Sequence, residues 1–395
     1  MATNSATGDP LEALKSQVKS TTELISQLQT LVHSIADDED PSTSTDAPPS
    51  SSSSSPPSNL ESVDPLSVAH DSATLIKAHT TKLSLLIINE PFTPSAISKV
   101  LHELVANPIP VLTFAVQICS ADKYTSFARQ DFAWRCYRVL KELKNFIEII
   151  PLNGKVLANA QKNGTSGDRG SLAATGVVWA ACDDVILLKK LGIAGLLVKK
   201  VEEYRDTLKD ILEELKEYSE EIDEDAEDDE VVGEGGVNGI ADQMQNTHIS
   251  TQAMLDDLMN PSHIPSGDPD KIRERLESCM KRLRLTTLLY TAVVKRRLKT
   301  LPPLPVTTQE SVIQRLDEVF PILKRLPHRF EEVACAFYEL DRGTIDTAMD
   351  NCFFDAFAAS EMLMKPWDGG RRDEFTEWAE KFQVGIKKPD QASVS

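Results

Sequence analysis

The most regular apolar pattern in the chain runs from residue 197 to residue 222. Its members alternate spacings of four and three, which is typical of a helix that buries one face against other helices. Burying each of these side chains stabilises by about 1.5–3 kcal/mol, whereas ordering one residue costs about 1–2 kcal/mol in backbone entropy. This heptad seam therefore needs partner helices, from this chain or from a binding partner. Its residues are Leu197, Val201, Tyr204, Leu208, Ile211, Leu215, Tyr218 and Ile222.

Proline-containing pairs predict where several helices begin. Asp9-Pro10, Asp64-Pro65 and Thr93-Pro94 each combine a capping residue with a proline suited to the first helical position. Helical spacing of apolar residues follows each pair, and no convincing run of strands occurs anywhere, so we expect an all-α protein. The expected helices are 11–36, 66–88, 96–105, 126–150, 171–191, 196–222, 270–298, 309–326, 327–340, 344–364 and 372–382, with a short apolar run at 110–119.

Two segments with few apolar residues divide the chain. Residues 41–60 are rich in Ser and Pro, and the acidic and polar segment 223–268 follows the heptad seam. Such compositions bury too little apolar surface to fold, so we expect disordered linkers. The predicted domains are an N-terminal amphipathic helix within 1–40, a helical bundle at 61–222, a second bundle at 269–385 and a disordered tail at 386–395.

Composition narrows the function classes. The chain has 395 residues, of which 41% are hydrophobic and 26% are charged, and we find no secretory signal and no stretch suited to span a membrane. The six cysteines are widely spaced, which predicts reduced thiols in an intracellular protein. The net charge of −19 repels phosphate backbones, so we expect no direct contact with nucleic acid.

Charge is unevenly distributed between two segments. Residues 202–234 are strongly acidic and residues 271–299 are strongly basic. An attraction between the two segments is the simplest interpretation. A solvated basic helix face and a local nucleic-acid contact remain as alternatives, although no aromatic residues interleave with the basic ones.

Motifs for catalysis or metal binding are missing from the sequence. Cys182-Asp183-Asp184 has no histidine close by in sequence, and the seven histidines show no metal-ligand spacing. The glycine-rich stretch at 163–170 lacks the spacing of a phosphate-binding loop. We therefore predict a protein that is not an enzyme and that uses no cofactor and no metal.

Residues 171–222 are arranged as a helix, a short turn at Gly192–Gly195 and a longer heptad helix. This order is typical of a helix-loop-helix dimerisation module, and the preceding residues lack the basic region that would grip DNA. Such a module could pair with a basic helix-loop-helix factor and keep it off DNA. The alternative is an ordinary helical hairpin inside a bundle.

Four sequence stretches together resemble the cyclin-D-binding protein family, also called GCIP, Maid or HHM. They are GVVWAACDDVILL at 176–188, VEEYRDTLKDILEELKEY at 201–218, PFTPSAISKVLHELVANPIPVLTFAVQ at 91–117 and, more weakly, RLDEVFPILKRLPHRFEEVACAFYEL at 315–340. The resemblance spans residues 65–350, and the Ser/Pro and acidic insertions suggest a distant, fungal-type member.

The resemblance carries expectations about fold and function. It implies packed antiparallel helical bundles similar to those of vinculin and α-catenin. It also implies a nuclear and cytoplasmic protein that binds cyclins or helix-loop-helix factors and negatively regulates cell-cycle progression and transcription. We expect the heptad seam to bind the partner, and the sequence leaves open whether the seam is instead core. A cytoskeletal or adhesion-type adaptor built from the same bundles is the alternative function. The oligomeric state is not indicated.

Overall fold

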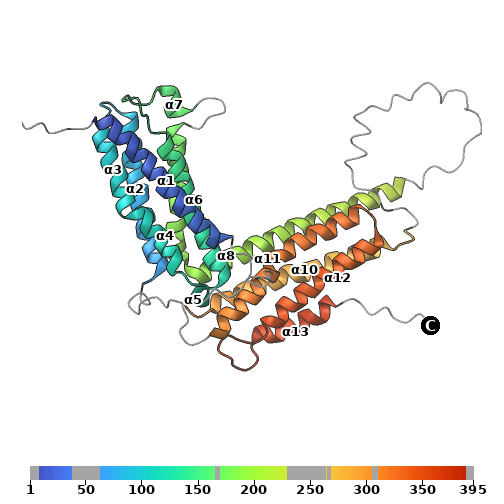
Figure 1. Cartoon of the computed structure of the whole chain (residues 1–395). Coiled ribbons are helices and arrows are strands. Elements are labelled where there is room, and N and C mark those ends of the chain that lie inside the picture. Colours follow the sequence, from blue (N-terminus) through green and yellow to red (C-terminus); the bar gives the residue numbers. More distant parts are fainter. Residues whose placement is uncertain are drawn as a thin grey trace, which may run out of the picture. The chain divides into compact units, whose positions relative to one another are not determined.

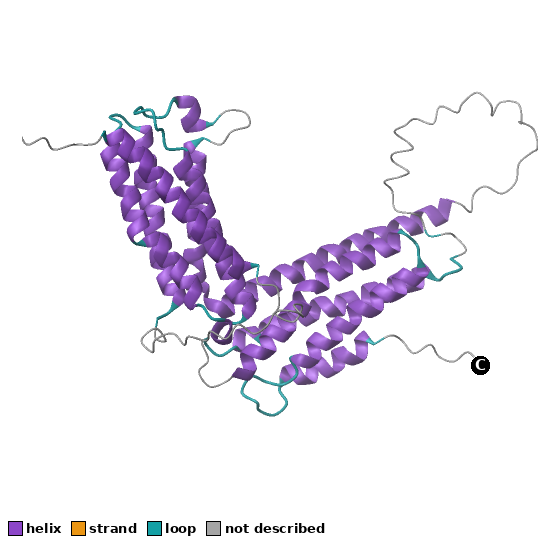
Figure 2. Ribbon diagram, in the orientation of Figure 1, coloured by secondary structure: helices purple, strands orange, loops and turns teal. Residues whose placement is uncertain are grey.

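The computed structural model describes residues 9–37, 63–164, 170–228, 264, 268–304 and 310–387 (Figure 1). Every regular element in these ranges is a helix (Figure 2), which confirms the all-α prediction. The similarity to vinculin and α-catenin stays a prediction. The Ser/Pro linker expected at 41–60 lies outside the described residues, as do most of the acidic linker at 223–268 and of the tail at 386–395.

The helices form two compact units. The N-terminal unit comprises Met1–Leu196 and Pro303–Asp317, and the C-terminal unit comprises Leu197–Pro302 and Glu318–Ser395. The first unit contains α1 (Pro10–Ala36), α2 (Pro65–Ile88), α3 (Pro94–Ala106), α4 (Pro108–Ile118), α5 (Ala121–Tyr124), α6 (Ser126–Glu148), α7 (Asn159–Asn163) and the first part of α8 (Ser171–Asp228).

All three predicted helix starts are found, and two of them carry a capping hydrogen bond. Asp9 accepts a hydrogen bond from the backbone N–H of Leu11, and Asp64 accepts from Leu66 and Ser67. Each carboxylate satisfies amide groups that have no partner within the helix. Thr93 also precedes a helix, α3, but its side chain makes no capping hydrogen bond.

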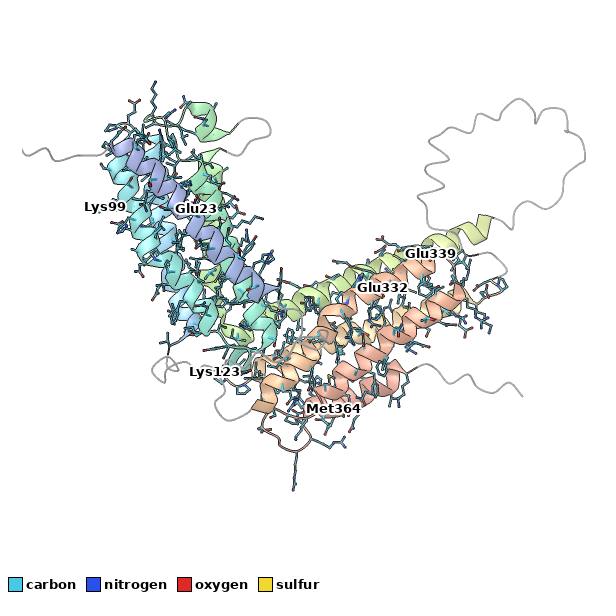
Figure 3. The ribbon with its side chains drawn as sticks, viewed as in Figure 1. Glu23, Lys99, Lys123, Glu332, Glu339 and Met364 are labelled. Carbon is cyan, nitrogen blue, oxygen red and sulfur yellow. The ribbon has the colours of Figure 1, made fainter. Side chains whose placement is uncertain are left out.

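The core of the N-terminal unit lies where α1, α2, α3, α4 and α6 run side by side (Figure 1). Phe132, Phe146 and Leu83 are fully buried there. Charged side chains such as Glu23 of α1 and Lys99 of α3 lie on the outer surface (Figure 3). The unit therefore buries one face of each amphipathic helix, as the apolar spacing indicates.

Helix α8 differs from the expected hairpin. The turn predicted at residues 192–195 is a break at a single residue, Gly192, with φ 65° and ψ 177°, and helix continues on both sides of it. The division between the two units falls directly after Leu196. The two parts of α8 therefore belong to different units, whereas the sequence placed both in one bundle ending at residue 222.

The C-terminal unit contains the second part of α8 and five further elements. The helices α10, α12 and α13 pack against one another. Helix α11 joins them through the Tyr290 hydroxyl, which donates to the carbonyl of Leu323 at 2.7 Å. The further elements are α10 (Ile272–Arg296), the short 3-10 helix η3 (Leu298–Thr300), α11 (Glu310–Tyr338), α12 (Arg342–Met362) and α13 (Glu374–Ile386). Of α11, the part from Glu318 on belongs to this unit, and the part before it belongs to the N-terminal unit.

Two helices were expected at 309–340, and the structure has one. Helix α11 runs through Pro321 and Pro327 without interruption. A proline inside a helix removes one backbone hydrogen bond, which usually ends or kinks the helix. Here Leu323, Leu326 and Phe330 form a fully buried stripe along this stretch, and their burial offsets the lost bonds.

The basic helix α10 pairs with Asp346 of α12 and with Asp373, the residue before α13. Arg275 bonds Asp346 of α12 at 3.0 and 3.1 Å, and Arg297, at the end of α10, bonds Asp373 at 2.7 and 3.0 Å. On the acidic helix, Glu203 and Asp206 pair with lysines one turn away, Lys200 and Lys209. The described ion pairs thus differ from the expected attraction between residues 202–234 and 271–299, whose acidic end lies outside the described side chains.

Two stretches, Pro94–Ile118 and Ser171–Glu220, are long and apolar enough to cross a membrane by composition. This finding corrects the expectation that no such stretch exists. In the structure both stretches also bury residues in a helical unit, for example Leu104 and Val185. Burial of one helix face is the behaviour of a core helix, which passes the same test of composition. The absence of a membrane partner stays a prediction.

Candidate protein-interaction surface

The heptad seam proposed for partner binding lies inside the C-terminal unit. Leu197, Val201, Leu208, Ile211, Leu215 and Tyr218 are buried, and Tyr204 is half-buried. The side chain of Ile222 lies outside the described residues. The described part of the seam is therefore core in this unit, and partner binding through it stays a prediction. A partner could reach it only if the second part of α8 left its unit.

Contacts with α11 show how the seam is held. The Tyr218 ring packs edge-on against Tyr338 with centroids 5.0 Å apart, and the Tyr218 hydroxyl points to the carbonyl of Phe337 at 3.5 Å. The Tyr338 hydroxyl donates to the Glu214 carboxylate at 2.7 Å. Burial raises the pKa of Tyr218 to about 12, so the ring stays neutral at all ordinary pH values.

An exposed apolar surface lies elsewhere, on the first part of α8. The buried side of this segment carries Val178, Cys182, Val185 and Leu188. Its opposite side is also largely apolar: Leu172 is 48% exposed and Leu187 is 40% exposed. A helix that is apolar all round is normally enclosed on all sides. We call the exposed side the α8 outer face; its residues are Leu172, Gly176, Trp179, Ala180, Leu187 and Leu191.

Polar contacts to α2 and α6 hold α8 at Asp183, which lies among the residues of this face, and at the neighbouring Asp184. Lys77 of α2 pairs with Asp183 at 2.6 Å, and Arg138 of α6 pairs with Asp184 at 2.7 Å. The Lys77 ammonium also lies 6.0 Å from the centroid of the Trp179 ring. These pairs neutralise both carboxylates in the middle of the helix and leave the apolar residues of the outer face uncovered.

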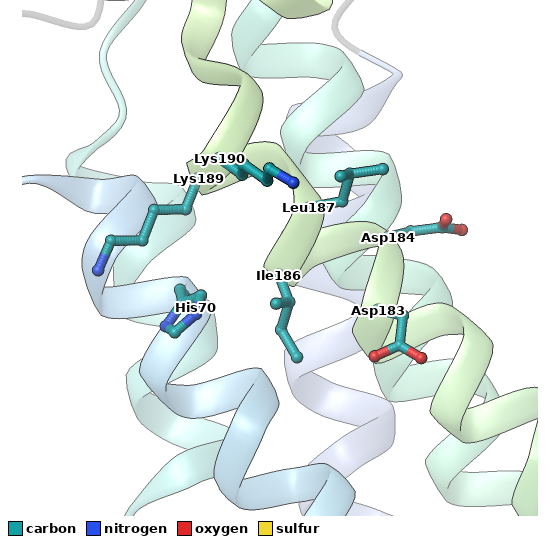
Figure 4. A pocket seen from close by; sticks show the side chains of 7 residues that line it. All are labelled: His70, Asp183, Asp184, Ile186, Leu187, Lys189 and Lys190. Atoms are coloured by element: carbon teal, nitrogen blue, oxygen red, sulfur yellow. The ribbon is translucent and has the colours of Figure 1, made fainter.

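A pocket of about 650 Å³ opens at one end of the outer face, between α2 and α8 (Figure 4). Figure 4 shows Ile186 between His70 of α2 and the two aspartates, with Lys189 and Lys190 near the upper end. An apolar lining residue, Ile186, with the ammonium groups of Lys189 and Lys190 nearby suits an apolar side chain next to an acidic one. The lining residues are His70, Asp183, Asp184, Ile186, Leu187, Lys189 and Lys190.

The chemistry of this region favours binding over catalysis. Cys182 lies beside the aspartates but is fully buried, and burial raises the pKa of its thiol to about 12. A thiol with such a pKa has almost no reactive thiolate near neutral pH. Across the described ranges, no group of three or more His, Cys, Asp or Glu side chains could hold a metal ion.

Comparison with known proteins finds a family that this region resembles. Residues 69–221 match the family model described as Grap2 and cyclin-D-interacting, N-terminal. The match confirms the predicted resemblance over α2 to α8, and the outer face and pocket both lie within it. A cyclin-D-interacting domain indicates a role in protein interaction.

A relative in Schizosaccharomyces pombe extends beyond this domain. It is an uncharacterized protein with 23% identity over 339 residues, covering 82% of this chain and 86% of the relative. The similarity therefore includes much of the C-terminal unit as well. This relative is fungal, in agreement with the expectation of a distant, fungal-type member.

The outer face was missed because apolar spacing cannot reveal it. A largely apolar stretch such as 176–188 is usually interpreted as a helix buried on all sides. The usable signal lies in the two carboxylates, Asp183 and Asp184, which a fully enclosed helix rarely carries without partners. Their pairing with Lys77 and Arg138 places both residues near the surface.

Proposed function

We propose that the chain is a non-enzymatic regulatory protein that binds a D-type cyclin through its Grap2 and cyclin-D-interacting domain. In this proposal it works in the cytoplasm and nucleus and negatively regulates cell-cycle progression or transcription, without contacting DNA. A helix-loop-helix factor is the other partner to be tested. The net charge of −19, which repels phosphate backbones, supports the absence of DNA contact.

The observation that carries the proposal is the α8 outer face within the matched domain. Apolar surface that remains exposed on a folded domain commonly marks a protein-binding site. Trp179 of this face is 37% exposed, and tryptophan is a residue type often responsible for binding energy at such sites. We therefore place the cyclin contact on this face and on the adjoining pocket. The heptad seam, which the sequence favoured, is buried.

Binding of purified full-length chain to a D-type cyclin, measured by calorimetry, tests the proposal. Trp179→Ser and Leu187→Asp change exposed side chains, so the fold should persist while affinity falls at least tenfold. Leu288→Asp is the matched control, because Leu288 is 52% exposed on α10 in the C-terminal unit. The Leu288→Asp chain should bind the cyclin with the affinity of wild type. A helix-loop-helix factor is titrated in parallel.

Two outcomes would overturn the proposal. One is that neither candidate partner binds the folded wild-type chain. The other is that the partner binds both outer-face variants as tightly as wild type, which would move the interface off the first part of α8. Circular dichroism of each variant confirms that the helical content is unchanged.

A further inference from the structure

Helix α1 lies outside the family domain but is packed onto it. The family match begins at residue 69, whereas α1 ends at Ala36 and residues 38–62 join the two. Helix α1 packs against α6, α3 and α4, as the dark blue helix in Figure 1 shows. The family domain therefore has a helix-binding surface formed by α3, α4 and α6, which we call the α1 groove.

The contact has the form of an amphipathic helix in a groove. Leu14, Ile25 and Val32 are completely buried, and Val18 is 8% exposed. The opposite face of α1 is charged and exposed, with Lys15 paired to Glu12 at 2.7 Å. Recognition of this kind depends on a few apolar anchors at helical spacing and tolerates change on the outer face. Any helix with the same anchors can use the groove.

One anchor of α1 is a poor fit. Thr21 lies in the middle of the buried stripe and is 0% exposed, yet its hydroxyl has no hydrogen-bond partner within the described residues. Other hydroxyls of α1, such as those of Thr22 and Ser26, donate to a carbonyl one turn earlier. A buried hydroxyl without a partner weakens the contact, and an aliphatic group of the same shape removes that penalty.

We propose that the α1 groove is a second protein-binding site, which α1 occupies within the same chain. Its partner is an amphipathic helix with apolar residues at the positions of Leu14, Val18, Ile25 and Val32 and an aliphatic residue in place of Thr21. A helix tethered to its own groove competes at an effective concentration in the millimolar range. Because Thr21 weakens the tethered helix, a better-matched partner helix displaces α1. This site is separate from the α8 outer face and does not depend on the cyclin proposal.

Hydrogen exchange of the full-length chain gives the first test. If α1 leaves the groove by itself, its amides exchange faster than those of α6. Thr21→Val should slow exchange in α1 about tenfold, equivalent to about 1.4 kcal/mol, and should leave α6 unchanged. Equal exchange rates in α1 and α6 would overturn the proposal, because α1 would then open only together with the unit.

Peptide binding to the full-length chain gives the second test. A fluorescent peptide of residues 9–37 is titrated against wild type and against a chain whose α1 carries Leu14→Asp and Ile25→Asp, which frees the groove. The peptide should bind the freed groove at least tenfold more tightly than wild type. A peptide with Thr21→Val should bind about tenfold more tightly again, and one with Ile25→Asp should not bind.

Two negative results together would overturn the proposal. The native peptide would fail to bind the freed groove, and the peptide with Thr21→Val would fail to bind the wild-type chain. If the chain with Leu14→Asp and Ile25→Asp unfolds, the hydrogen-exchange rates of the wild-type and Thr21→Val chains still test the proposal. Concentration-dependent dimerisation of wild type, abolished by Ile25→Asp, would assign the groove to α1 of a second copy and overturn the partner assignment.

Discussion

Arg297 joins three segments of the C-terminal unit. It is 2% exposed, and its guanidinium donates to the carbonyls of Leu363 and Met364 at 2.7 and 3.0 Å. Two further bonds reach the Asp373 carboxylate, and the guanidinium carbon lies 4.2 Å from the centroid of the Phe375 ring. A planar group with five donors suits this position, and lysine could not replace it. The charge is therefore tolerated because nearly every donor has an acceptor.

Asp373→Asn tests the charged half of this arrangement. Asparagine keeps the shape and can still cap α13, where Asp373 accepts from the Thr376 amide at 2.9 Å. Losing the charge-assisted bonds should lower the unfolding free energy at pH 7 by about 1–2 kcal/mol, because Asp373 is 37% exposed and solvent screens the pair.

The stability difference between wild type and Asp373→Asn should depend on pH. The Arg297 guanidinium, with the Thr376 amide and hydroxyl, holds the pKa of Asp373 well below its usual range, against the opposing effect of burial. A lowered folded pKa stabilises the protein above the unfolded value of 3.8, and this stability is lost as pH falls below it. The difference between wild type and Asp373→Asn should therefore shrink by up to about 1 kcal/mol at pH 3.

Urea unfolding followed by fluorescence measures both effects. Replacing Trp134 and Trp179 by Phe leaves Trp367 and Trp378 as reporters of the C-terminal unit. A difference that stays constant from pH 7 to pH 3 would mean that the Asp373 charge does not stabilise the folded state.

At the scale of the element, α8 depends on two glycines with opposite requirements. Gly192 has φ 65°, a conformation that residues with a side chain rarely adopt, although a methyl group there would meet no atom within 4 Å. Gly176 is helical and also faces open space. The break in α8 therefore depends on backbone freedom at Gly192, and Gly176 only lowers helix propensity.

Exchanging each glycine for alanine separates these roles. Gly192→Ala should lower the unfolding free energy by about 1–3 kcal/mol through backbone strain. Gly176→Ala should raise it by about 0.5–1 kcal/mol because alanine is the better helix former. Thermal unfolding followed by circular dichroism compares the two. Equal effects of the same sign would show that the break at Gly192 is not set by its positive φ.

The starts of the helices were easier to predict than their ends or the neighbouring helices that cover them. Asp9-Pro10 and Asp64-Pro65 specify helix starts through local hydrogen bonds, which the sequence contains in full. The continuity of α11 through Pro327 was not predictable, because the burial that offsets the lost bonds comes from distant segments. The heptad spacing likewise predicted a buried face at Leu208 and Leu215, but spacing does not identify the helices that cover it.

At the scale of the whole molecule, the chain has two hydrophobic cores, and α8 contributes to both. Val178 and Val185 belong to the N-terminal unit, whereas Leu208 and Leu215 belong to the C-terminal unit. The two proposed binding surfaces follow this division. The α8 outer face and the α1 groove are both in the N-terminal unit, and the seam stabilises the C-terminal one. A substitution in the seam should therefore act on stability.

Leu215→Asp tests this division in the full-length chain. Leu215 is 0% exposed, and burying an unpaired carboxylate there should destabilise the C-terminal unit by more than about 4 kcal/mol. Hydrogen exchange should then show lost protection in the second part of α8 and in α10 to α13, with α1 to α6 unchanged. Glu217→Ala, on the exposed side of the same turn, is the matched control and should leave exchange as in wild type.

Loss of protection throughout α1 to α6 in the Leu215→Asp chain would contradict the division into two units and would mean that the chain unfolds as one. The expected result is that protection persists only in the N-terminal unit and that cyclin binding is unchanged. The family domain would then bind its partner through the α8 outer face while the heptad seam is unfolded. The seam, although it is the most regular pattern in the sequence, would serve folding and not recognition.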